Sequence, residues 1–92
     1  MRKKNLLKAK ERHTRENLAD FLTGLAEQIR TGELKLVQAN TETIVTVPEN
    51  LRVDIEITEE LKRRGTKREL EIEMWWYEGE DGEPAGGPLT LG

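Results

Sequence analysis

Few residues in this chain have side chains that could carry out catalysis. The 92 residues include no cysteine and no serine, and His13 is the only histidine. Nucleophilic catalysis needs a hydroxyl or thiol beside a base, and a catalytic zinc site usually has three protein ligands at a recognisable spacing. His13 lies in a basic stretch, where an exposed or interfacial histidine is the simplest interpretation. We therefore expect no catalytic residue, no metal site and no cofactor, and the protein is not predicted to be an enzyme.

Acidic side chains recur at every second position in two segments. If each segment is a strand, these side chains share one face of a sheet; they are Asp54, Glu56, Glu69, Glu71 and Glu73. Adjacent carboxylates can gather divalent cations or form an acid–base pair. A flat row lacks the convergent oxygens of a loop site, however. The simpler interpretation is a solvated face, relieved by Arg52, Lys35 or Lys8 on neighbouring strands.

Basic side chains are concentrated in two segments of a chain whose net charge is −3. Residues 1–15 carry seven of them against one acid, and five more lie between Lys62 and Arg68. The second segment could bind a phosphate backbone, and the candidate anion contacts are Arg63, Arg64, Lys67 and Arg68. A soluble hairpin tip whose charges oppose aggregation is the alternative. The acidic remainder of the chain argues against strong nucleic-acid binding.

Two adjacent tryptophans end the last alternating segment. Alternation places Trp76 with the apolar Leu70, Ile72 and Met74, and Trp75 with the glutamates. An exposed tryptophan near a strand end suits a protein partner or a stacked nucleobase. Alternatively, Trp75 covers the stem of a lysine or arginine through a cation–π contact. The candidate partner contacts are Trp75, Glu71 and Glu73.

A helix is predicted from about Thr14 to Thr31. Its apolar residues recur at helical spacing and form one stripe: Leu18, Phe21, Leu22, Leu25, Ala26 and Ile29. Thr14 suits the N-cap position, and Gly32 suits the left-handed residue that ends a helix. Gly24 weakens the middle of the helix unless it allows a close approach to a sheet.

After Gly32 the apolar spacing changes to every second residue, which is typical of strands. Four segments show this spacing or are β-branched throughout: 33–36, 43–47, 51–57 and 69–76. Loops are expected at 38–42 and, around Gly65, at 62–66. Such alternation indicates an antiparallel sheet with one buried face. We therefore predict an α+β fold, in which one amphipathic helix packs on one face of a four- to five-stranded antiparallel sheet.

Three regions are expected along the chain. Residues 1–13 form a basic segment, in which residues 5–12 are expected to be a further strand with Leu7 and Ala9 facing in, or alternatively a basic arm. Residues 14–77 form the helix and sheet. Residues 78–92 hold five of the eight glycines and two of the three prolines, which indicates a disordered tail. The longest apolar run is four residues, 74–77, so we expect neither a membrane span nor a signal peptide, and a cytoplasmic location.

The order of these patterns resembles the amphi-Trp domain, a small family named for a strongly amphipathic strand that ends in tryptophan. The residues that carry the resemblance lie in four stretches: 14–16, 21–29, 32–36 and 69–76. The resemblance implies the fold described above and implies no established activity.

Our functional hypothesis is a non-catalytic protein-interaction module that binds an unknown protein or a second copy of itself. The alternative is a nucleic-acid or polyanion accessory protein that uses the basic arm and the Lys62–Arg68 hairpin.

Overall fold

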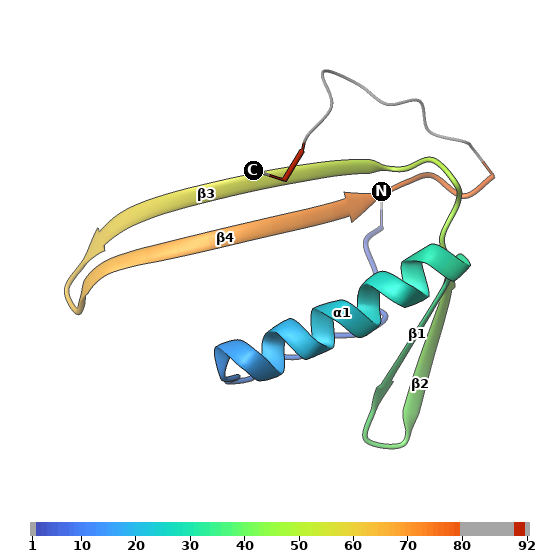
Figure 1. The fold of residues 1–92 in the computed structure, drawn as a ribbon, viewed down its shortest axis with the longest axis horizontal. Helices are drawn as coiled ribbons and strands as arrows, with labels where there is room; N and C mark the ends of the chain where they lie inside the picture. Colours follow the sequence, from blue (N-terminus) through green and yellow to red (C-terminus); the bar gives the residue numbers. More distant parts are fainter. Residues whose placement is uncertain (1, 80–89, 92) are drawn as a thin grey trace. The chain divides into compact units, whose positions relative to one another are not determined.

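A computed structural model of the protein describes residues 2–79 and 90–91. The chain divides into two compact units, Met1–Val47 and Pro48–Gly92. The first unit contains a helix and two strands, α1 (Arg15–Thr31), β1 (Glu33–Gln38) and β2 (Thr41–Thr46). The second contains two longer strands, β3 (Arg52–Lys62) and β4 (Gly65–Trp75), which run side by side as a hairpin (Figure 1).

The ends of α1 confirm the predicted helix. The Thr14 side chain accepts a hydrogen bond of 3.0 Å from the backbone N–H of Asn17, which makes Thr14 the N-cap. At the other end Gly32 has a φ of 88°, and its N–H donates to the carbonyl oxygens of Gln28 and Ile29. Glycine suits this position because a left-handed backbone imposes no steric cost on it.

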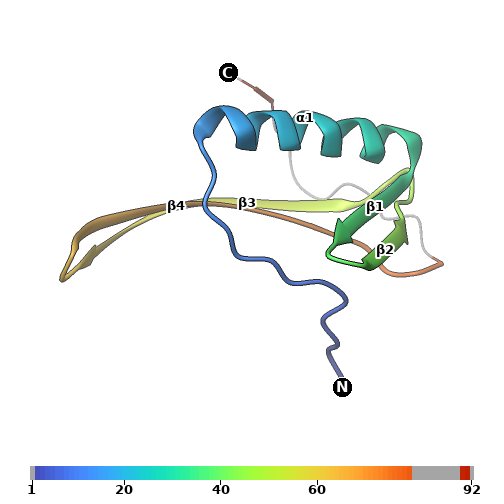
Figure 2. The same ribbon diagram turned by 90° about the horizontal axis from the view of Figure 1, so that it is seen from below.

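The C-terminal part of α1 packs on β1 (Figure 2). Leu34 and Leu36 on β1 are half-buried, as is Val45, which pairs with Leu34 from β2. The Gln28 side chain joins the two elements directly. Its Nε2 donates to the carbonyl oxygen of Lys35 over 3.1 Å, and its Oε1 accepts from the Lys35 N–H over 2.9 Å. One amide therefore pairs with the β1 backbone as a neighbouring strand would.

The connection between β1 and β2 is shorter than the predicted loop at 38–42. Gln38 and Thr41 already form the last pair of the ladder, so only Ala39 and Asn40 make the turn. Ala39 has a φ of 53°. The two-residue turn contains no glycine, and for this reason the sequence did not reveal it.

The basic N-terminal segment forms no strand over residues 5–12. It is nevertheless attached to the first unit, because Gln38 Nε2 donates to the carbonyl oxygen of Lys8 over 3.0 Å. Leu7 is half-buried. The further strand that the sequence favoured over residues 5–12 is therefore not formed, and the structure has the alternative, a basic arm.

The β3–β4 hairpin is longer than the sequence predicted. Each strand has eleven residues, and β3 continues past Ile57 to Lys62. The turn consists of Arg63 and Arg64, since Lys62 already pairs with Gly65. Gly65, which was expected to be the centre of the turn, begins β4 with a φ of 133°.

The α+β class and the antiparallel strands are confirmed. The four strands form two separate two-stranded sheets, β1–β2 and β3–β4, and a single sheet of four or five strands is not shown. Within the described residues, no helix is long and apolar enough to cross a membrane. Most of the predicted tail, 80–89 and 92, lies outside the described residues.

Candidate interaction site on the β3–β4 hairpin

The register of the hairpin separates its side chains into two faces. One face, here called the apolar face, carries three cross-strand pairs: Val53 with Met74, Ile55 with Ile72, and Ile57 with Leu70. Nearer the turn, the same face carries Glu59 with Arg68 and then Leu61 with Thr66. The other face, here called the polar face, carries the alternating acids and Trp75. The observed pairing therefore places Trp75 on the face opposite the apolar residues of β4, as the alternation in the sequence predicted.

The acids of the polar face lie opposite one another. Asp54 pairs with Glu73 and Glu56 pairs with Glu71, while Glu69 faces Thr58. Like charges directly opposite each other on neighbouring strands are destabilising. Over the part of the chain that the structure describes, none of these five carboxylates has an ion-pair partner. In the same residues no three acidic or histidine side chains lie close enough to hold a metal ion.

Trp75 is the last residue of β4 and lies on the polar face, at the end of the hairpin away from the turn. It is half-buried. Its Nε1 donates to Asp54 Oδ2 over 3.1 Å, and the Arg52 guanidinium carbon lies 5.0 Å from the ring centroid. Tyr77 meets the indole edge-on, with ring centroids 6.0 Å apart. The predicted cation–π contact is therefore present, and the indole is held beside the carboxylates in a defined orientation.

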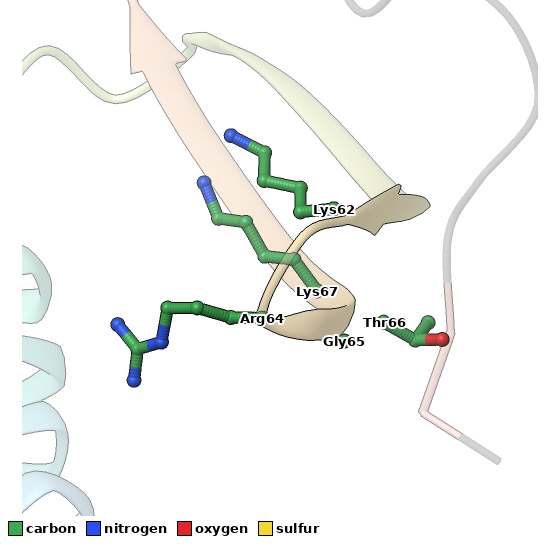
Figure 3. Close-up of a pocket in the computed structure, with 5 residues that line it drawn as sticks. All are labelled: Lys62, Arg64, Gly65, Thr66 and Lys67. Atoms are coloured by element: carbon green, nitrogen blue, oxygen red, sulfur yellow. The ribbon is translucent and has the colours of Figure 1, made fainter.

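The basic residues gather at the other end of the hairpin. A hollow of about 550 Å³ is lined there by Lys62, Arg64, Gly65, Thr66 and Lys67 (Figure 3). Lys62 and Lys67 extend from the two strands, and Arg64 extends from the turn in a separate direction. Lys62 lies 3.5 Å from a carboxylate oxygen of Glu60. Arg63, Arg64 and Lys67 have no ion-pair partner among the described residues.

Arg68 differs from the other three candidate anion contacts. It lies on the apolar face, and its Nε donates to Glu59 Oε1 over 3.0 Å. Its charge is therefore partly neutralised within the hairpin. Of the four candidates, Arg63, Arg64 and Lys67 are the ones whose charges remain available at the tip.

Sequence reasoning missed the roles of Arg52 and Asp54. Arg52 was expected to relieve the acidic row, but it stacks on the Trp75 ring. Asp54 was treated as one acid of that row, although it accepts the indole N–H. Both residues contact Trp75 across the hairpin, Arg52 directly opposite and Asp54 diagonally. Such pairs are predictable only when the register is known.

β4 is thus an amphipathic strand in which glutamates alternate with Leu70, Ile72 and Met74 and which ends at Trp75. The family model for the Amphi-Trp domain matches residues 1–92. The chain belongs to the Amphi-Trp domain family. No curated protein and no solved structure gives a significant match to the sequence. Membership in the Amphi-Trp family confirms the resemblance seen in the sequence and assigns no activity.

Proposed function

We propose that this Amphi-Trp protein is a non-catalytic protein-interaction module whose polar face binds a cationic segment of a partner protein. The observation that carries the proposal is the position of Trp75, which its contacts with Asp54 and Arg52 hold at the end of a row of carboxylates. An aromatic side chain fixed before binding loses little conformational entropy when a partner docks.

The electrostatics of the polar face favour a partner of positive charge. The opposed pairs Asp54–Glu73 and Glu56–Glu71 repel each other in the free hairpin. A lysine or arginine placed between two such carboxylates would replace this repulsion by attraction. The acidic row would also raise the association rate constant of a cationic segment. Both the affinity and the association rate should fall as salt is added.

Affinity capture with matched variants tests this proposal. Trp75→Ala removes the aromatic anchor and Glu71→Lys reverses one charge of the row. Glu49→Lys makes the same charge change at an exposed residue outside the hairpin strands. A true partner should bind the wild type and Glu49→Lys and be lost from the other two variants. If every captured protein binds all four chains equally, the polar face is not the contact surface.

A second candidate function is polyanion binding at the hairpin tip. The hollow lined by Lys62, Arg64 and Lys67 favours it, as does Arg63, which has no ion-pair partner in the described part of the chain. Cationic side chains that displace counterions from a phosphate backbone produce binding that falls steeply with salt.

Fluorescence anisotropy with short labelled DNA and RNA tests the second function. The double variant Arg63→Gln, Arg64→Gln should bind more weakly at low salt and show a shallower salt dependence than the wild type. Arg30→Gln, on the exposed side of α1, is the control and should leave binding unchanged. No binding of any oligonucleotide by the wild type at low salt would eliminate this function.

A further inference from the structure

Among the described residues of its own unit, none covers the apolar face of β3–β4. Its six side chains are between 38% and 76% exposed: Val53, Ile55, Ile57, Leu70, Ile72 and Met74. No residue of β3 or β4 is buried. A two-stranded hairpin without further cover is at best marginally stable in water. Patches of this kind mark sites of association.

We propose that a second copy of this chain covers the apolar face, and that the two hairpins pack face to face about a two-fold axis with their tips at opposite ends. The apolar face lies opposite the polar face, so this dimer does not depend on the proposed function. The axis would run between the two sheets, across the strands and level with the Ile55–Ile72 pair. Each Ile72 would then meet the other copy's Ile72, as an isologous interface requires.

The side-chain pairs of the apolar face are arranged so that the two-fold rotation brings apolar pairs onto apolar pairs. On each hairpin the Ile55–Ile72 pair lies between the Val53–Met74 and Ile57–Leu70 pairs. Rotation about the axis places Val53–Met74 of one copy over Ile57–Leu70 of the other. The exposed area of the six side chains is on the order of 600 Å² per copy, so complete coverage by a second copy would bury at most about 1,200 Å², which reaches the lower end of specific interfaces.

The charges of the hairpin determine the direction of packing. The tip holds five cations between Lys62 and Arg68, whereas Asp54, Glu71 and Glu73 lie toward the other end. Parallel packing would place the two tips side by side and concentrate like charge. Antiparallel packing separates the tips by the length of the strands and places each near the acidic half of the other copy.

Sedimentation equilibrium of the full chain tests the proposal through the mass of the particle. We expect twice the 10.6 kDa of one chain at micromolar concentration. Ile72→Glu and Ile72→Lys, measured separately, should each raise the dissociation constant by roughly a hundredfold or more, because like charges would meet in an apolar contact. Thr58→Lys, a charge placed on the polar face, should leave the mass unchanged.

Mixing the two Ile72 variants distinguishes a second copy of the chain from any other segment that could cover the apolar face. Opposite charges would then meet at the axis, so an equimolar mixture should recover the two-chain mass, even if either variant alone folds poorly. A wild type with the mass of one chain would overturn the proposal. So would a mixture that stays monomeric while both variants lose stability, the result expected if α1 covers the face. Trp75→Ala should keep the two-chain mass, so failure of the proposed function would be seen separately.

Discussion

Trp75 is restrained from two directions. Its N–H is hydrogen-bonded to Asp54, and the Arg52 guanidinium lies over its ring. A hydrogen bond to a charged acceptor contributes about 1.5–3 kcal/mol when the pair is shielded from water, and less at an exposed carboxylate such as this one. Together these contacts make the indole a fixed feature of the polar face rather than a mobile surface side chain.

The hydrogen bond to Asp54 predicts a signature in the NMR spectrum. In Asp54→Ala the Trp75 indole proton loses a charged acceptor, so its signal should move upfield. The indole signal of Trp76, for which the structure shows no hydrogen bond to Asp54, should stay in place. A ¹H–¹⁵N correlation spectrum of the two chains makes the comparison. Equal behaviour of the two indole signals would contradict the hydrogen bond.

At the scale of the elements, Gly24 is a weak point of α1. A Cβ added at this position would meet nothing within 4 Å, so the glycine allows no close approach within the first unit. Gly24→Ala should therefore raise the free energy of unfolding by about 1 kcal/mol, through the higher helix propensity of alanine. Urea denaturation measures the change. A decrease instead would show that another surface approaches α1 at this residue.

The Gln28 amide predicts a second change in stability. Gln28→Met keeps the length of the side chain but removes both hydrogen bonds to the Lys35 backbone. The free energy of unfolding should fall by about 1 kcal/mol, since water can replace part of the lost bonding at this exposed edge. Gln38→Met, which removes the single bond to Lys8, should cost less in the same urea titration.

The sequence predicts those elements whose signals are local. The stripe of α1, its caps at Thr14 and Gly32, and the alternation of β3 and β4 all follow from the spacing of residue types. The turns at Ala39–Asn40 and Arg63–Arg64 lie inside the predicted loops, but neither two-residue turn contains a glycine, so the sequence did not show which residues make them. The two hydrogen bonds from the Gln28 side chain to the Lys35 backbone were not predicted, because a single amide that pairs with a backbone produces no repeating pattern in the sequence.

The candidate site was predictable to the same extent. Alternation alone placed Trp75 with the glutamates, because parity along one strand decides which face a side chain occupies. The opposition of Asp54 to Glu73 and the indole bond to Asp54 depend on the register between two strands. Register comes from the length of the turn, which the sequence did not fix.

At the scale of the whole molecule, the distribution of charge is more informative than the net value of −3. The basic arm and the basic hairpin tip carry most of the positive charge, and the rest of the chain is acidic. The hairpin itself is divided, with cations at the turn and carboxylates along the polar face. This division of charge is the basis for the two proposed binding surfaces, one for a cationic partner and one for a polyanion, and we expect both to weaken as salt is added.

The most direct test of the proposed function is an NMR titration of the ¹⁵N-labelled full chain, at low salt, with a short lysine- and arginine-rich peptide. A glutamate-rich peptide of equal length is the control. We predict that the basic peptide shifts the Trp75 indole signal and the amide signals of Asp54, Glu71 and Glu73, and that added salt reverses the shifts. If these signals stay fixed while the control peptide moves those of Arg63, Arg64 and Lys67, the polar face is not the binding surface and the tip is.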